Sequence, residues 1–271
     1  RIEEGGRQIV VMTRWAERDL CGRLLAAQPG MWRVLRLPAL DEGTGEMLCP
    51  SLLSRARYEE LSRLTGTAVM RANYQQEPVE RRGLLYDHFS TYARLPERFE
   101  RIISYTDTAD TGRDFLCCVA AGVWRGQLYL LDVCYTDQPM EVTEGLVAAL
   151  LHRCRVDEAA IESNNGGRGF ARNVRELLYD RHGDRAVRVL ALPQRANKEA
   201  RMLVQAGFVE KNVLMPEDWG ARWGAFYRAM NGFLRAGRNA HDDAPVAVTG
   251  LAEFFLRGGR TEFRSGAGRR A

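Results

Sequence analysis

The sequence predicts an α/β protein whose core is a mixed β-sheet flanked by helices. Three observations support this fold class. Short apolar runs of strand length follow one another closely after residue 100, a glycine-containing turn joins two of them, and strand-like and helix-like stretches then alternate. The alternation is typical of parallel strands joined by helices, whereas the tight turn requires an antiparallel pair. We therefore expect one sheet with both kinds of pairing.

The first segment, residues 1–80, is expected to hold two strands and two helices. Its apolar runs predict strands at 7–13 and 32–37, and its helical spacing predicts helices at 17–27 and 55–64. These elements contain too few apolar residues to form a stable hydrophobic core of their own. A charged linker is expected to lead from this segment to the next.

Three strands in quick succession are predicted to open the second segment. They cover 101–107, 115–124 and 127–135, and the turn at 124–127 reads as a hairpin between the last two. A helix of about 14 residues is expected after Pro139, where apolar side chains recur at helical spacing.

Strand and helix then alternate. A strand at 157–162, a helix at 168–179 and a strand at 186–192 complete the pattern. Three antiparallel strands followed by this alternation form the order of the RNase H-like fold, and we place such a domain at 84–257. Ligand sites in open α/β sheets generally lie at the strand ends.

The remaining sequence predicts helices and a tail. Residues 195–235 are expected to form two helices around a short strand at 208–215, and residues 244–257 a last helix. The tail at 258–271 is rich in arginine and glycine, and we expect it to be disordered.

Composition excludes several classes of protein. At 271 residues and 45% hydrophobic, the chain can bury a core, and no apolar run approaches the roughly 18–20 residues of a membrane-spanning helix. Its six cysteines show no CxxC pair, so structural zinc is not expected and a reducing cytoplasm is the natural compartment. A strand-like run begins soon after Arg1, so we expect the chain to be a piece of a longer protein.

The basic residues are almost all arginine. The net charge is +4, and the 39 basic residues include only two lysines, Lys198 and Lys211. Arginine suits phosphate recognition because its planar fork bonds bidentately. A GC-rich genome would produce the same skew, so the composition is consistent with nucleic-acid contact without demonstrating it.

Acidic side chains stand where predicted elements end or begin. Asp107 and Glu162 each close a short apolar run, and the pair Asp242–Asp243 opens the last helix. Hard divalent cations prefer oxygen ligands, and two ions roughly 3.5–4 Å apart can hold the attacking and leaving oxygens of a phosphodiester. The set therefore predicts a two-metal nuclease, although any one of these acids could be a turn or capping residue.

Other polar residues near these positions are secondary candidates. A glycine-rich stretch follows Glu162 and opens a helix whose N-terminus favours anions, so Arg168 is a candidate for nucleic-acid binding. Lys198 is a second such candidate, with a phosphate or a catalytic carboxylate as its partner. Asp110 and Asp114 could assist, but turn chemistry is the simpler explanation of both.

Several motifs are absent from the sequence. Neither lysine follows a glycine, so the chain lacks the P-loop GxxxxGK[ST], and HExxH and GxSxG are also missing. We therefore expect no ATP hydrolysis from this chain and no histidine-based metal cage.

The order of several short stretches resembles the large subunit of tailed-phage terminases. The first segment resembles the end of that family's ATPase domain in VVMTRWAERDLCGRLL (10–25), RLPAL (36–40) and NYQQEPV (73–79). The second resembles its nuclease domain in SYTDTAD (104–110), DFLCCVAAG (114–122), IESNNGG (161–167), NKEAR (197–201) and HDDAPVAVTGL (241–251). The resemblance spans about residues 7 to 257.

The resemblance implies an endonuclease that cuts concatemeric double-stranded DNA in the host cytoplasm during phage genome packaging. It implies two Mg²⁺ or Mn²⁺ ions held by Asp107, Glu162 and one or both of Asp242 and Asp243. We expect Asp243 to face the ions and Asp242 to cap the helix or to bind through water. The implied partners are DNA, a portal protein and a terminase small subunit, and the implied ATPase motifs lie upstream of Arg1.

Two alternatives remain open. Many relatives carry a further aspartate near Val246, where this chain has none, and a degenerate DNA-binding or portal-docking module would explain that difference. Another RNase H-like enzyme, such as a resolvase or transposase, is the second alternative. The resemblance of the first segment to an ATPase domain argues against the second.

Overall fold

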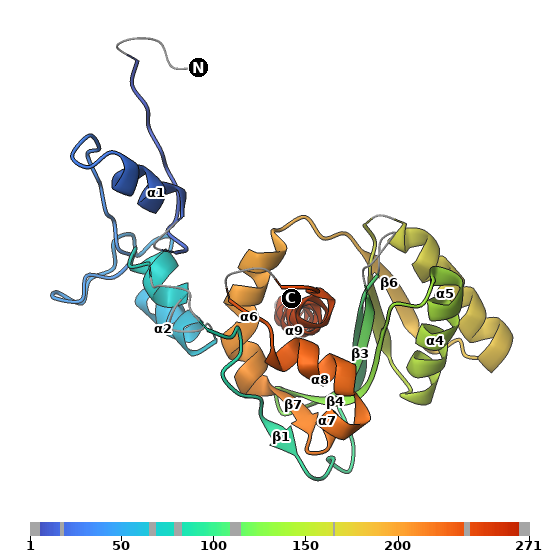
Figure 1. Ribbon diagram of the computed structural model, residues 1–271. Coiled ribbons are helices and arrows are strands. Elements are labelled where there is room, and N and C mark those ends of the chain that lie inside the picture. Colours follow the sequence, from blue (N-terminus) through green and yellow to red (C-terminus); the bar gives the residue numbers. More distant parts are fainter. Residues whose placement is uncertain are drawn as a thin grey trace. The chain divides into compact units, whose positions relative to one another are not determined.

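The protein is described by a computed structural model that covers residues 6–16, 19–64, 69–78, 83–108, 115–164, 166–235 and 239–265 (Figure 1). The chain divides into two compact units, Arg1–Gly83 and Leu84–Ala271.

The first unit consists of short helices and extended chain. Its helices are α1 (Leu20–Ala27), α2 (Arg55–Leu64) and the π-helix η1 (Met70–Tyr74). The side-chain amide of buried Gln75 forms two hydrogen bonds with the backbone of Leu40: Leu40 N donates to Gln75 Oε1 at 3.2 Å, and Gln75 Nε2 donates to Leu40 O at 3.0 Å.

Two predicted strands are missing from the described part of this unit. Residues 7–13 and 32–37 have no regular secondary structure, so both predictions are wrong. A strand obtains its backbone hydrogen bonds from a neighbouring strand, and the described residues of this unit supply only an isolated bridge between Leu40 and Met47. The apolar runs therefore lie exposed, with Val11 at 90%.

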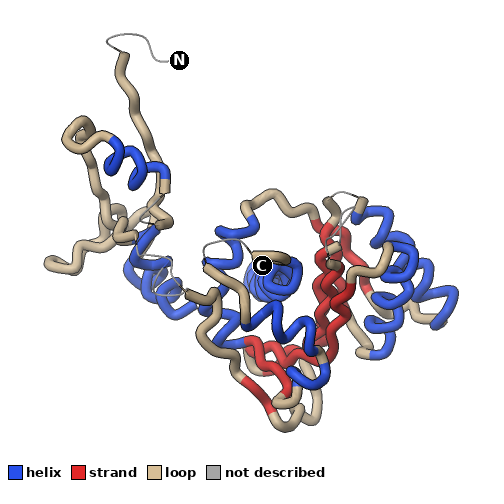
Figure 2. Tube along the Cα trace, viewed as in Figure 1, coloured by secondary structure: helices blue, strands red, loops and turns tan. Residues whose placement is uncertain are grey.

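A seven-stranded mixed sheet forms the centre of the second unit (Figure 2). In spatial order its strands are β1 (Thr91–Tyr92), β7 (Val213–Pro216), β4 (Gln127–Thr136), β3 (Leu116–Trp124), β2 (Arg101–Asp107), β5 (Glu158–Glu162) and β6 (Arg188–Leu192). β2, β3 and β4 pair antiparallel, whereas β2, β5 and β6 pair parallel. This order confirms the predicted RNase H-like α/β fold.

Helices cover both faces of the sheet. α4 (Met140–Arg153) and α5 (Gly167–His182) lie on one side, and α9 (Asp243–Ser265) lies on the other (Figure 1). Because both faces are covered, the central strands are almost continuously buried, which explains their uninterrupted apolar sequences. α5 ends where Gly183 adopts a left-handed φ of 63°.

The C-terminal part differs from the sequence-based prediction in two places. Helix α6 (Lys198–Asn212) continues through most of the predicted strand at 208–215, which shrinks to β7, and the short helices α7 (Trp219–Arg222) and α8 (Gly224–Asn231) follow. The amphipathic helical spacing therefore outweighs the β-branched residues near Val209. Helix α9 is helical beyond residue 257, where disorder is predicted, and ends at Ser265; residues 266–271 lie outside the described chain.

No helix in the described ranges is both long and apolar enough to span a bilayer.

Helix α9 approaches the sheet closely because one of its residues lacks a side chain. A Cβ atom on Gly250 would lie 2.3 Å from Cε1 of the Tyr105 ring. Tyr105 is itself buried at 2% exposure, so its ring has little room to move. The glycine therefore sets the distance between α9 and β2.

We expect Gly250→Ala to destabilise the protein by about 1–3 kcal/mol, because the added methyl group forces α9 away from Tyr105. Urea unfolding followed by circular dichroism measures this change. The matched control is Gly169→Ala in α5, where a Cβ meets nothing within 4 Å. The control should be neutral or slightly stabilised; equal effects of the two changes would contradict the packing argument.

Candidate active site

Asp107 and Glu162 end two neighbouring parallel strands. The register of β2 and β5 pairs Thr106 with Ile161, so the two acidic residues follow at the same edge of the sheet. Side chains alternate between the faces of a strand, and paired residues share a face. Asp107 and Glu162 therefore lie side by side on one face.

Helix α9 brings the third acidic position to this face. Asp243 is the first residue of α9, and Asp242 precedes it. The contact of Gly250 with Tyr105 shows that α9 packs on the face of β2 that carries Tyr105 and, two residues later, Asp107. The strand ends and the helix start therefore bring the predicted acidic residues into one neighbourhood.

Three of these carboxylates are almost fully buried. The exposed fractions are 4% for Asp107, 6% for Glu162 and 6% for Asp243. Glu162 accepts hydrogen bonds from Tyr105 Oη at 3.3 Å and Asn164 Nδ2 at 3.0 Å. In contrast, Asp107 Oδ2 is buried without a hydrogen-bond partner. A buried polar atom without a partner requires an explanation, such as an ion that is held when the protein acts.

Burial raises the pKa of the Asp107 carboxyl to about 8. The Lys198 ammonium opposes this shift, while the carboxylates of Glu162, Asp243 and Asp242 add to it because like charges disfavour joint ionisation. Burial, followed by the neighbouring Asp242, also raises the pKa of Asp243.

Lys198 is the cation at this cluster of acids. It is the first residue of α6, and its Nζ lies 3.7 Å from Asp242 Oδ1. Burial acts to lower the pKa of Lys198, but the attraction of the surrounding carboxylates, Asp107 first, outweighs it and raises that pKa. Asp242 is thus the half-exposed member of the acidic pair and is partnered by Lys198, whereas Asp243 is buried.

The remaining predicted residues occupy the rim or lie elsewhere. Arg168 is exposed on the first turn of α5, one short loop after Glu162. His241, which was not predicted, directly precedes the acidic pair; its Nδ1 is 4.0 Å from Asp243 Oδ2, and its ring contacts Phe115 edge to face. Asp110 and Asp114 lie outside the described residues.

The donor set fits a hard divalent cation. All three buried side chains offer carboxylate oxygens, the ligands that Mg²⁺ and Mn²⁺ prefer, and Asp107 Oδ2 has no competing partner. Within the described ranges, however, no three His, Cys, Asp or Glu side chains are grouped so that they could hold an ion.

Sequence reasoning missed the residues that hold Glu162 in place. Asn164 lies in the IESNNGG stretch but was given no role of its own, and Gln194, Arg201 and Glu253 were not singled out. Asn164 could have been found from its position two residues after a strand-end carboxylate. The other three come together only through the packing of α6 against α9.

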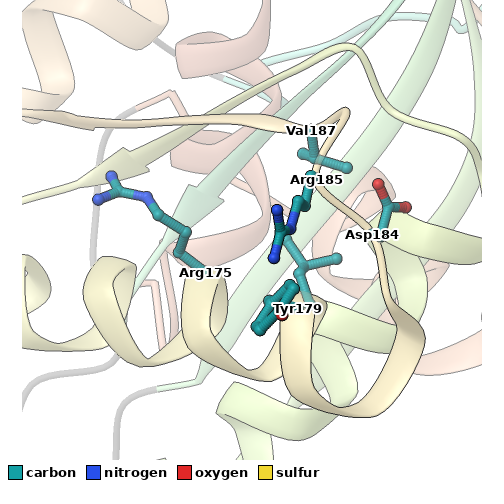
Figure 3. Close-up of a pocket in the computed structure, with 6 residues that line it drawn as sticks. Arg175, Tyr179, Asp184, Arg185 and Val187 are labelled. Carbon is teal, nitrogen blue, oxygen red and sulfur yellow. The ribbon is translucent and has the colours of Figure 1, made fainter.

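A shallow hollow of about 250 Å³ lies beside helix α5. It is lined by Arg175, Leu178, Tyr179, Asp184, Arg185 and Val187. These residues belong to the second half of α5 and to the loop that leads from α5 to β6, and α5 runs back along the sheet from the end of β5. The hollow is therefore at the opposite edge from Glu162. Arg185 covers the Tyr179 ring at 4.2 Å (Figure 3).

The chain matches no protein-family model and no curated protein. Among solved structures it is similar to the large terminase of a thermophilic bacteriophage in complex with ADP. The TM-score is 0.54 at 12% identity, over 76% of this chain and 53% of that chain. The structure of the same terminase in complex with ATP-gamma-S gives a TM-score of 0.53 at 12% identity, over 75% and 53%.

The likeness to the thermophilic phage terminase establishes a shared fold. This chain spans about half the length of the terminase chain that it matches. A weaker likeness is to the nuclease domain of human cytomegalovirus terminase, soaked with Mn and inhibitor bound; its TM-score is 0.45 at 15% identity, over 60% of this chain and 88% of that domain.

The raised pKa of Asp107 has a consequence for stability. The folded carboxyl keeps its proton up to about pH 8, whereas the unfolded one loses it near pH 3.8. The folded state therefore binds more protons between these values, and Asp107 makes the free energy of unfolding fall as the pH rises from about 4 to 8. Each pKa unit corresponds to about 1.4 kcal/mol.

We expect Asp107→Asn to raise the melting temperature in the presence of a chelator, and to raise it more at pH 8 than at pH 5. Thermal melts of both proteins at the two pH values provide the measurement. A variant that is equally or less stable than the parent at pH 8 would contradict the burial of an uncompensated carboxyl at this site.

Proposed function

We propose that this chain is the nuclease part of a terminase large subunit, a metal-dependent endonuclease that cuts double-stranded DNA during phage genome packaging. The observation that carries the proposal is that β2, β5 and α9 bring three buried carboxylates to one edge of an RNase H-like sheet. One of them, Asp107, has a buried oxygen without a partner. A purely structural role leaves that oxygen unexplained.

Asp107, Glu162 and Asp243 would hold two Mg²⁺ or Mn²⁺ ions, with Asp242 supporting them from the rim. When bound, such ions lower the pKa of a water nucleophile and stabilise the leaving 3′-oxygen. The chain itself contributes the burial that keeps bulk water from these carboxylates and the rigid strand ends that fix their spacing.

The basic residues would orient the DNA. Lys198 lies beside the acidic cluster, so its ammonium can hold a phosphate close to the carboxylates and offset their repulsion of the DNA backbone. Arg168 is exposed near the N-terminus of α5, where backbone N–H groups and a guanidinium can bind another phosphate.

The shared fold supports the packaging role. The similar protein of the thermophilic phage is a large terminase, and its structures were determined with ADP and ATP-gamma-S. In this proposal the first unit belongs to the end of the ATPase domain, this chain alone does not hydrolyse ATP, and its partners are DNA, a portal protein and a small subunit in the host cytoplasm. The order of the short terminase-like stretches between about residues 7 and 257 also supports it.

One observation favours a second candidate, a DNA-binding module without nuclease activity. The described carboxylates do not form a ready three-ligand group, as expected for a degenerate site. Plasmid nicking with and without Mn²⁺ separates the two candidates, with DNA binding measured in parallel by gel shift. Binding without metal-dependent nicking would favour the module.

The two neighbouring aspartates should differ in importance. Asp243 is buried whereas Asp242 pairs with Lys198 at the rim, so Asp243→Asn should abolish Mn²⁺-dependent nicking and Asp242→Asn should reduce it on the order of tenfold. The measurement is the rate at which supercoiled plasmid is converted to open circles. If Asp242→Asn abolishes nicking and Asp243→Asn only reduces it, the roles assigned to the two aspartates are wrong, but the proposed nuclease activity is not contradicted.

Metal binding should stabilise the fold because an ion relieves the repulsion between buried carboxylates. We expect millimolar Mn²⁺ to raise the melting temperature of the parent protein by several degrees, since a ligand at about 100 times its Kd adds about 2.7 kcal/mol. Asp243→Asn should lose most of this rise. A parent protein whose melt is unchanged by Mn²⁺ has no competent metal site.

A further inference from the structure

The carboxylate of Glu162 is held by a side chain that is itself held on two sides. Asn164 Nδ2 donates to Glu162 Oε1 at 3.0 Å and to Gln194 O at 2.7 Å. Gln194 N donates back to Asn164 Oδ1 at 3.2 Å. The amide of Asn164 thus uses both donor hydrogens and its acceptor, so it cannot rotate without breaking three hydrogen bonds.

Gln194 connects Asn164 to a buried ion pair. Its Nε2 donates to Glu253 Oε2 at 3.2 Å, and the same carboxylate accepts from Arg201 Nε at 3.1 Å and Nη2 at 2.9 Å. The side chains of Arg201 and Glu253 are only 6% and 15% exposed. A charge-assisted pair shielded in this way is much more rigid than a surface ion pair.

The ion pair joins the two helices that bring charged groups to the site. Arg201 lies one turn after Lys198 on α6, and Glu253 lies on α9, the helix that begins at Asp243. The Arg201–Glu253 pair therefore ties the helix carrying Lys198 to the helix carrying Asp243. Through Gln194 and Asn164 it also reaches the end of β5.

We propose that Asn164, Gln194 and the Arg201–Glu253 pair are positioning residues that set the orientation of the Glu162 carboxylate for metal binding. The inference rests on the proposed nuclease function and adds to it residues that do not touch DNA or metal. A carboxylate that binds an ion must be held within about 0.5 Å and 10–20° of its productive geometry. Groups bonded to such a ligand typically contribute 10–100-fold to metal affinity.

The structure contains a matched control for the Asn164 contact. Asn173 Nδ2 donates to Glu144 Oε1 at 2.8 Å, which is the same amide–carboxylate hydrogen bond between α5 and α4, on the other side of the sheet. Replacing either asparagine by alanine removes one such bond, and Asn164→Ala also removes the two hydrogen bonds between Asn164 and the backbone of Gln194. Only Asn164→Ala loosens Glu162, which then keeps the hydrogen bond from Tyr105 Oη.

We expect Asn164→Ala to weaken Mn²⁺ binding 10–100-fold in calorimetry and to lower kcat for plasmid nicking, while the KM for DNA stays within about threefold. Asn173→Ala should leave Mn²⁺ affinity, kcat and KM unchanged. Circular dichroism and a melt without metal verify that both variants are folded.

Exchanging the residue types at positions 194 and 253 tests the series of contacts, here called the relay, that runs from Asn164 through Gln194 to the Arg201–Glu253 pair. Gln194→Glu places two carboxylates in contact, and Glu253→Gln removes the charge that holds Arg201, so each should weaken Mn²⁺ binding at least tenfold. In the double variant the amide at position 253 donates to the carboxylate at position 194. Arg201 then still has a carboxylate nearby, the one at position 194. The double variant should recover Mn²⁺ affinity to within about threefold of the parent protein, a rescue that general destabilisation does not produce.

The outcomes separate this inference from the function on which it rests. If the parent protein neither binds Mn²⁺ nor nicks DNA, the proposed function fails and the positioning role fails with it. If the parent does both and Asn164→Ala behaves like Asn173→Ala, the nuclease stands and the positioning role of Asn164 is overturned. Should Asn164→Ala not fold, the exchange between positions 194 and 253 decides, and absence of rescue overturns the relay.

Discussion

The parallel pairing of β2 with β5 is the constraint on which the candidate site depends. Because Thr106 lies opposite Ile161, both strands end at the same level and present Asp107 and Glu162 on the same face. A register shift of one residue would turn one carboxylate to the α4–α5 side of the sheet. The buried core beneath that side, which includes Cys118 and Ile161, makes such a shift costly and therefore protects the geometry of the acidic edge.

Without a bound metal ion, burial of these carboxylates lowers the stability of the folded protein. The surrounding structure offsets part of this loss. Asp107 is the destabilised residue, because burial raises the pKa of its carboxyl and its Oδ2 has no hydrogen-bond partner. Lys198 offsets part of the charge, and the close contact of Gly250 with Tyr105 keeps α9 against the sheet. The same helix carries Asp243 and Glu253, so the packing of one element both supplies an acidic side chain and anchors the hydrogen bonds that orient Glu162.

The sequence was informative wherever local pattern and burial agree. The strands at 101–107 and 127–135 were recognisable because the sheet is covered on both faces, and the helix after Pro139 because its apolar spacing is regular. The prediction at 7–13 failed because an apolar run forms a strand only beside another strand, and the described part of the first unit offers none. The predicted strand at 208–215 failed because helical packing outweighed local β propensity.

The sequence by itself determined the α/β class, the order of the central strands and the acidic positions at element ends, because these follow from periodicity and from where apolar runs stop. Only the tertiary structure decided which acids are buried, that Asp243 is enclosed while Asp242 pairs with Lys198, and that Gln194, Arg201 and Glu253 reach Glu162 through Asn164. These relations join residues far apart in the chain. They arise from strand register and helix packing, which no local pattern of residues encodes.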